Sequence, residues 1–279
     1  MAESVLSGAR ILVVAFEGWN DAGEAASAAA RRLRESFEVV PVADVDPEAY
    51  FDYQFSRPMI TSEPDGSRRI VWPSVTLYAP ANDSHHVHLL MGTEPSREWQ
   101  TFAEEILERA GELDLDIVVF LGAMLADVPH SRPIGVHATS DAAEVREILG
   151  LARSQYEGPV GIISVLAAAF EEAGLPSISV WASVPHYVHN APSPKATLAL
   201  LDRIEELVGI SAERGDLLAE SQAWETGIDQ LADDDEEMAS YIQSLERARD
   251  TVDAPEATGD AIAEEFERYL RGRGEQPGA

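Results

Sequence analysis

The stretch that decides the fold is Ile11-Leu12-Val13-Val14-Ala15-Phe16, which runs directly into Glu17-Gly18-Trp19-Asn20-Asp21-Ala22-Gly23. Its first six residues form an unbroken apolar run, typical of a buried parallel strand, and alanine-rich sequence follows the last glycine. A buried strand, a glycine-bounded turn and a helix open an α/β domain, and such domains place functional groups at the carboxyl ends of their strands. We therefore expect an α/β fold with a candidate site at this turn.

The turn has the glycine spacing of a phosphate-binding loop but not its chemistry. Gly18 and Gly23 are five residues apart, but a phosphate loop continues from its second glycine with Lys and then Ser or Thr. Glu24 stands in place of the lysine, and a carboxylate at the start of a helix repels a bound phosphate. In the structural interpretation, Asn20 or Asp21 caps the helix and Gly18 permits the turn.

Composition narrows the classes of protein and partner. Fifty acidic residues against twenty basic ones give a net charge of −30, so we expect neither nucleic acid nor an anionic membrane as a partner, whereas a basic protein surface is allowed. There is no cysteine, so disulfides, thiolate metal sites and a cysteine nucleophile are ruled out. The apolar run 117–126 is only ten residues long and no signal-like segment is found, so we expect a cytoplasmic protein.

Strand and helix patterns alternate through the first two hundred residues, as in a mostly parallel sheet covered on both faces. Strands are expected at 10–16, 38–43, 69–78, 86–91, 116–122 and 177–184. Helices are expected at 22–36, 96–111, 141–153, 163–173 and 194–208, most with a start signal such as Ser193 and a stop signal such as Gly209. The segment 46–66 has no clear period and is interpreted as an excursion that leads into a β-hairpin.

Several later motifs occur in the order found in one family. They are Gly122-Ala123-Met124-Leu125-Ala126-Asp127-Val128-Pro129-His130-Ser131-Arg132-Pro133, then Tyr156-Glu157-Gly158-Pro159-Val160-Gly161-Ile162, then Val184-Pro185-His186-Tyr187-Val188, followed by Pro192-Ser193-Pro194. With the opening turn, they make roughly residues 10 to 208 resemble the proteasome assembly chaperone family in its actinobacterial branch. The resemblance implies a three-layer α/β/α domain, similar in architecture to nucleoside phosphorylases and peptidyl-tRNA hydrolases. It also implies self-association, with a trimer as the expected order, and no settled reaction.

The resemblance also bears on partners. Archaeal and eukaryotic relatives bind proteasome α-subunits, often through a C-terminal hydrophobic-Tyr-any tripeptide. This sequence ends in Gln276-Pro277-Gly278-Ala279, and Tyr269 lies ten residues before the end. Proteasome subunits are therefore an expected partner, but not through that tripeptide.

Beyond Gly209 the apolar positions recur in alternating steps of four and three, which is a heptad pattern. They are Leu217, Trp224, Ile228, Leu231, Met238, Ile242 and Leu245. We expect one or two long helices, with any break near the acidic run 233–237, and a further amphipathic helix at about 259–270. The expected domains are a core at 1–209, an acidic helical arm at 210–271 and a disordered tail at 272–279.

Because the carboxyl ends of parallel strands converge, three polar loops are expected to share one crevice. Their candidate residues are Glu17, Gly18, Trp19, Asn20 and Asp21 in the first loop, Asp127, His130 and Arg132 in the second, and His186 and Tyr187 in the third. In a small-molecule hydrolase or a nucleoside-phosphorylase-like enzyme, Glu17 or Asp127 would act as the base. His130 or His186 would act as the acid, with Asn20 orienting the ligand. In the structural interpretation, these residues cap helices and satisfy backbone amides.

Other sequence features point to chemistry less strongly. Ser164 lacks the second glycine of a Gly-x-Ser-x-Gly elbow. His86 and His88 share a strand face near Asp83, which is half of a zinc site, but the residues before them equally form a turn. We therefore expect no metal and no cofactor.

Lys195 and Trp19 are also interpreted individually. Lys195, the only lysine, follows Pro194 and is interpreted as a helix-start or surface residue. Trp19, in a polar turn, is interpreted as an exposed anchor at a subunit contact. The leading hypothesis is an oligomeric, non-catalytic, protein-binding protein, and the alternative is the small-molecule enzyme.

Overall fold

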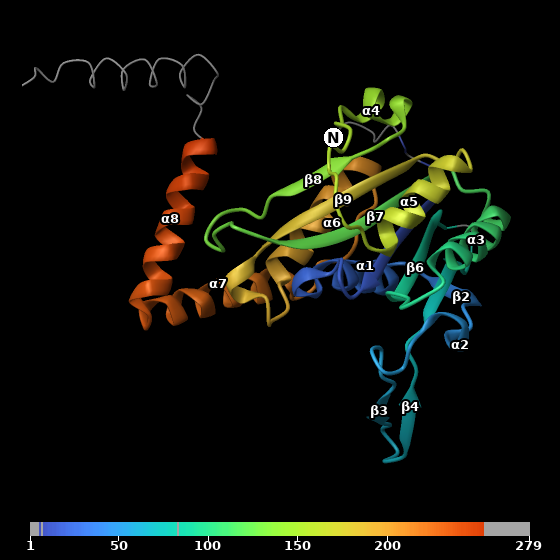
Figure 1. The fold of residues 1–279 in the computed structure, drawn as a ribbon, viewed down its shortest axis with the longest axis horizontal. Helices are drawn as coiled ribbons and strands as arrows, with labels where there is room; N and C mark the ends of the chain where they lie inside the picture. Colours follow the sequence, from blue (N-terminus) through green and yellow to red (C-terminus); the bar gives the residue numbers. More distant parts are fainter. Residues whose placement is uncertain (1–5, 7, 83, 254–279) are drawn as a thin grey trace, which may run out of the picture.

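The computed structural model describes residues 6, 8–82 and 84–253, and its centre is a seven-stranded mixed sheet (Figure 1). The strand order is β2-β5-β6-β1-β7-β9-β8. The four central strands run parallel: β6 (Val87–Thr93), β1 (Ile11–Glu17), β7 (Ile117–Ala126) and β9 (Ser177–Pro185). The outer strands are antiparallel to their neighbours: β2 (Val39–Asp44) and β5 (Val75–Pro80) at one edge, and β8 (Val136–Thr139) at the other.

Helices cover both faces of the sheet, which makes the predicted three-layer α/β/α fold. On one face lie α1 (Ala25–Ser36) and α6 (Pro194–Val208), with Val145 of α4 (Ala143–Leu149) packed into the same cluster. On the other lie α3 (Trp99–Ala110) and α5 (Ile162–Glu172). Strand β1 is buried on both sides: Val13 packs with the α1 and α6 cluster, and Val14 with the α3 and α5 cluster. The unbroken apolar run at 11–16 therefore reflects burial on two faces.

Several short elements lie between the longer strands and helices. They are η1 (Ala22–Glu24), α2 (Pro47–Tyr50), η2 (Gly111–Leu113) and η3 (His186–Val188). The strand expected at 69–78 is two strands, β4 (Arg68–Val71) and β5, separated around Pro73. Proline lacks the N–H that a continuous ladder requires, so the chain changes sheets there. Strand β4 pairs with β3 (Met59–Ser62), and this hairpin projects away from the central sheet (Figure 1).

After α6 the chain forms α7 (Leu217–Asp233) and α8 (Glu236–Asp253), and the break between them falls within the acidic run. Helix α7 packs along α6, whereas α8 stands upright beside the body (Figure 1). The heptad pattern does not form one continuous buried seam. Leu217, Ile228, Ile242 and Leu245 are buried, Trp224 and Met238 are half-buried, and Leu231 is exposed. Because α7 and α8 meet at an angle, the apolar face of one helix does not continue along the other. Leu231, near the end of α7, is therefore exposed although it fits the heptad pattern.

The boundary expected at residue 209 does not separate the packing of the two parts. Ile210, Ala212 and Leu217 belong to the hydrophobic cluster of the core. The helix expected at 259–270 and the tail expected at 272–279 lie outside the described residues. Within the part of the chain that is described, no helix is both long and apolar enough to cross a membrane.

Candidate functional site

Two of the three polar loops expected to converge start side by side. Strands β7 and β9 are parallel neighbours, and their last residues, Ala126 and Pro185, are in register. The loop 127–133 and η3 therefore leave the sheet at the same edge. This register brings His130 next to Tyr187.

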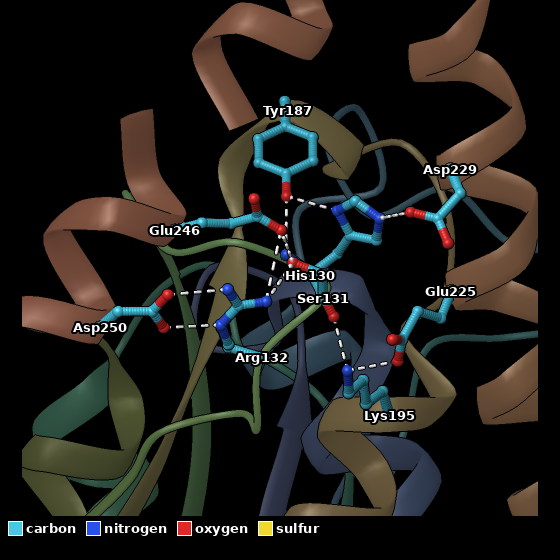
Figure 2. A network of polar contacts seen from close by, with 9 residues as sticks. All are labelled: His130, Ser131, Arg132, Tyr187, Lys195, Glu225, Asp229, Glu246 and Asp250. Carbon is cyan, nitrogen blue, oxygen red and sulfur yellow. Dashed lines mark hydrogen bonds and ion pairs between the residues drawn. The ribbon is translucent and has the colours of Figure 1, made fainter. Parts of the chain in front are cut away.

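His130 lies at the centre of a polar network (Figure 2). It is 1% exposed. The Tyr187 hydroxyl accepts a hydrogen bond from the backbone N–H of His130 at 2.7 Å and lies 2.9 Å from Nδ1. On the other side of the ring, Nε2 lies 3.0 Å from Oδ1 of Asp229 on α7. These partners assign the proton to Nε2, which donates to the carboxylate, and leave Nδ1 to accept from the tyrosine.

The Tyr187 hydroxyl is held in its protonated form. Burial raises the pKa of Tyr187 to about 12. The hydroxyl therefore keeps its proton at neutral pH and donates it to Nδ1 of His130. Each ring nitrogen of His130 therefore has a hydrogen-bond partner inside the protein.

Lys195 lies at the start of α6, as one interpretation of the sequence predicted, but its side chain belongs to this network and not to the open surface. Its Nζ donates to the carbonyl oxygen of His130 at 2.5 Å and to Oε2 of Glu225 at 2.5 Å. The side chain is only 16% exposed, because α7 packs over the start of α6 and brings Glu225 against it. The only lysine of the chain thus ties the His130 loop to α7.

Arg132 and Ser131 tie the same loop to α8. Arg132 makes a bidentate contact with Asp250, with Nε at 2.7 Å from Oδ1 and Nη2 at 2.8 Å from Oδ2. Its Nη1 lies 3.4 Å from Glu246, which also accepts a hydrogen bond from the Ser131 hydroxyl. The loop 130–132 therefore holds both C-terminal helices against the end of the sheet (Figure 2).

Asp127 and His186 form a second, more exposed contact to α8. Asp127 Oδ1 lies 3.2 Å from Nδ1 of His186, without hydrogen-bond geometry, and accepts a hydrogen bond from the Tyr241 hydroxyl at 3.3 Å. The His186 ring packs edge-on against Tyr187 and Tyr241. Asp127 and His186 therefore lie next to each other, and both also contact Tyr241 of α8.

Sequence reasoning missed the α7 and α8 partners of these loops, although a signal was present. Glu225 and Asp229 are four residues apart, as are Glu246 and Asp250. Acids at that spacing lie on one helical face and repel each other unless a cation or a donor faces them. The heptad pattern identifies only the apolar positions of these helices and not the acidic residues that bind the loops.

The first polar loop lines a hollow with its residues 18–21, and neither His130 nor Tyr187 is among the lining residues. This hollow, which we call the Trp19 groove, is an open cavity of about 1390 Å³. Its floor is the face of β8 and β9 next to α5, where Ser179 and Trp181 line the cavity. Val180, between them in β9, is buried in the core on the opposite face. Serine alternating with apolar residues in β9 thus reflects one covered and one open face.

Exposed apolar side chains gather around the Trp19 groove. They are Trp19, Met124, Leu125, Tyr156 and Val160. The exposure of Trp19, at 64%, is that expected from its place in a polar turn. The groove thus presents a contact surface that is more apolar than polar.

Asn20 positions the turn beneath the groove. Its Nδ2 donates to Oε1 of Glu94 at 3.0 Å, and the same carboxylate oxygen accepts from the backbone N–H of Ile162 at 2.9 Å. A Cβ at Gly161 would lie 2.1 Å from Nδ2 of Asn20, so only glycine fits there. Asn20 is 2% exposed and bound to Glu94, an acid that sequence reasoning had not singled out.

The remaining residues of the first loop have structural partners. Oδ1 of Asp21 accepts from the backbone N–H groups of Ala26 and Ser27 at 2.8 and 3.1 Å, which caps α1, and burial raises the pKa of Asp21. Gly18 has φ of +125°, a conformation that side chains disfavour. Glu17 pairs with an arginine of α1 at 3.1 Å. The ten candidate residues thus divide between the His130 network and the turn beside the Trp19 groove.

Among the described residues, the histidine pair belongs to no group that could hold a metal ion. His86 is exposed, whereas His88 is buried and desolvation lowers its pKa. Asp83 lies outside the described residues. Among the residues that are described, no group of three or more His, Cys, Asp or Glu side chains could hold a metal ion.

The fold and the site define an α/β/α protein whose polar loops are tied to its own C-terminal helices and whose open surface is an apolar groove. The sequence profile of the PAC2 family matches residues 15–232, so the chain belongs to the PAC2 family. The match begins in β1 and ends within α7.

Solved structures from actinobacteria resemble this chain closely. A PAC2 family protein from Streptomyces avermitilis is 41% identical, with a TM-score of 0.75, over 83% of this chain and 98% of that one. A proteasome-assembly chaperone homologue from Mycobacterium tuberculosis is 42% identical, with a TM-score of 0.74, over 83% and 99%. A Mycobacterium tuberculosis protein of unknown function is 27% identical, with a TM-score of 0.78, over 88% and 86%. No curated protein matches the sequence.

Proposed function

We propose that this protein is a non-catalytic, protein-binding member of the PAC2 family that takes part in proteasome assembly as a homo-oligomer in the cytoplasm. The observation that carries the proposal is the 42% identity, over 83% of the chain, to a protein described as a proteasome-assembly chaperone homologue. The site agrees with it, since both ring nitrogens of His130 are engaged and the exposed surface is an apolar groove. A binding protein needs a contact surface and no free acid or base.

The test is co-purification from an actinobacterium that expresses the tagged full-length chain. Proteasome α-subunits are expected to be enriched with the wild-type chain, as measured by mass spectrometry against an unrelated acidic protein carrying the same tag. If α-subunits are equally abundant with the unrelated protein, the proposal is wrong.

A second candidate is a small-molecule hydrolase or a nucleoside-phosphorylase-like enzyme, and the Trp19 groove is the feature that favours it. Polar side chains lie among its apolar ones, including Ser140, Ser164 and His137. Turnover of a panel of esters and nucleosides by the wild-type chain, abolished by His137→Ala, would favour the enzyme. The absence of turnover together with co-purified α-subunits would favour the binding protein.

A further inference from the structure

The hairpin of β3 and β4 and its flanks carry six of the large apolar side chains that are exposed in the described chain. They are Phe55, Met59, Ile60, Ile70, Val71 and Trp72. Every residue of both strands is exposed, and Figure 1 shows the hairpin extending away from the body. Two strands alone are marginally stable in water, and clustered apolar side chains mark a contact surface. The hairpin therefore has the character of an element that is covered in a complex.

The hairpin and its flanks, residues 55–72, carry three arginines against Glu63 and Asp65, a net charge of +1 in a strongly acidic chain. Arg57, Arg68 and Arg69 are all exposed, and Arg69 pairs with Glu63 of the same hairpin at 2.8 Å. Within the residues that the structure describes, Arg57 and Arg68 form no ion pair. Unpaired arginines beside apolar side chains complement an apolar surface with an acidic rim.

The Trp19 groove of the same chain has that chemistry. Four acids and one arginine line it: Asp21, Glu24, Asp141, Glu171 and Arg153. Asp141 pairs with Arg153 at 2.6 Å and Glu24 lies 3.7 Å from Arg31, so the lining remains acidic in balance. Its volume of about 1390 Å³ is larger than that of most small-molecule sites, which are roughly 300–1,000 Å³. The groove therefore accommodates a polypeptide segment with several large side chains.

We propose that the β3–β4 hairpin of one copy docks in the Trp19 groove of a second copy. This inference rests on the self-association in the proposed function and assigns the two surfaces that produce it. Because a hairpin meets a groove, the contact is heterologous, and repeating it builds a closed ring rather than a symmetric dimer when the rotation between copies closes. Met59, Ile60 and Ile70 would pack against the apolar walls of the groove. Arg57 and Arg68 would face its acidic side chains.

A mixing experiment tests the heterologous contact. Ile60→Asp disables the hairpin and Leu125→Asp disables the groove, and both positions are exposed in the single chain. By light scattering, the wild-type mass is expected to be a multiple of 30.3 kDa and each variant is expected to be monomeric. The equimolar mixture is expected to form a two-chain species, because one intact hairpin then meets one intact groove. The control Val40→Asp should keep the wild-type mass.

Three outcomes would overturn the proposal: a monomeric wild-type chain, a mixture that stays monomeric, or variants that keep the wild-type mass. Circular dichroism and melting temperatures establish that each variant is folded. The outcome does not decide the proposed proteasome partner, because co-purification of α-subunits measures that separately.

Site-specific cross-linking supplies a second measurement that does not depend on disrupting the interface. The native chain has no cysteine, so introduced thiols are the only ones present. A short bismaleimide is expected to join Ile60→Cys chains to Leu125→Cys chains in a mixed oligomer, and to join neither variant to itself. Self-linking of Ile60→Cys alone would indicate a contact between two hairpins and would contradict the proposal.

Discussion

At the scale of single residues, the buried polar groups His130 and Asp21 are bound to partners inside the protein. His130 has partners for both ring nitrogens and for its backbone N–H and carbonyl groups. Asp21 is committed to the first amides of α1. Buried polar groups stabilise a fold only when such partners are present. The hydrogen bonds of His130 and Asp21 therefore stabilise the fold.

Asp21 tests the distinction between a helix cap and a charged functional group. We expect Asp21→Ala to lower the free energy of unfolding at pH 7 by about 1 kcal/mol, because two amides of α1 lose their acceptor. Asp21→Asn keeps an acceptor oxygen without a buried charge and should unfold at or above the wild-type denaturant concentration. Urea titrations of both variants measure the difference. Equal loss of stability in the two variants would contradict the capping role.

The pH dependence of the same residue has a defined sign. Burial raises the pKa of Asp21 above its ordinary value of 3.8, so the folded state binds more protons than the unfolded state between the two values. The contribution of Asp21 to stability is therefore largest below pH 3.8 and decreases as the pH rises through its folded-state pKa. Subtracting the urea data of Asp21→Asn from those of the wild type at each pH isolates this contribution. An increase of that difference with pH would show the sign to be wrong.

Tyr187 and Tyr241 form a matched pair within the same aromatic cluster. Tyr187→Phe should lower the free energy of unfolding by about 1–3 kcal/mol, because it leaves the N–H and Nδ1 of buried His130 without a partner. Tyr241→Phe removes only a 3.3 Å bond to the exposed Asp127 and should change stability little. Chemical denaturation of both variants measures the contrast. A larger loss for Tyr241→Phe would show that the network does not depend on His130.

At the scale of helices and strands, local sequence patterns predicted most elements but not how these elements pack against one another. Helix α6 spans the predicted 194–208, with a Ser193 cap and Gly209 at its end. The four-residue strand β8 was missed, because a short strand at a sheet edge has too few alternating positions to show a period. The angle between α7 and α8 depends on what each helix packs against. No local repeat specifies that angle.

The exposed and buried positions of the heptad pattern give an element-scale prediction. Ile242 is 6% exposed on α8, whereas Leu231 is 62% exposed at the end of α7. Ile242→Asp should lower the free energy of local opening of α8 by about 2–5 kcal/mol and release the amides of α8 to hydrogen exchange, because it places a carboxylate at a buried position. Leu231→Asp should leave both quantities near their wild-type values. Similar exchange rates for the two variants would mean that α8 does not pack as described.

At the scale of the whole molecule, the C-terminal helices make unequal contributions to the core. Ile210, Ala212 and Leu217 pack with the core cluster, and the PAC2 match extends to residue 232. Helix α8 follows that match and is held through the loop 130–132. The body of the fold thus includes α7, whereas α8 is attached to its surface.

Two truncations separate these roles. A chain ending after Asp233 should keep a cooperative thermal transition within a few degrees of the wild type, because the contacts it loses lie outside the core cluster. A chain ending after Gly209 should aggregate or melt at a much lower temperature, because burial of three core side chains is lost and apolar surface is exposed. Calorimetry and light scattering measure both outcomes. Equal melting temperatures for the two truncations would place the boundary of the fold at residue 209 after all.

The sequence by itself determined the three-layer α/β/α class, the order of most elements and the family. These depend on apolar alternation, turn residues and motif order, all of which are local properties of the chain. Only the tertiary structure decided that His130 meets Asp229, 99 residues away, and that Arg132 meets Asp250, 118 residues away. Such contacts require α7 and α8 to pack at particular angles over the end of the sheet. Packing angles arise from the fit of whole surfaces, so local periodicity does not record them.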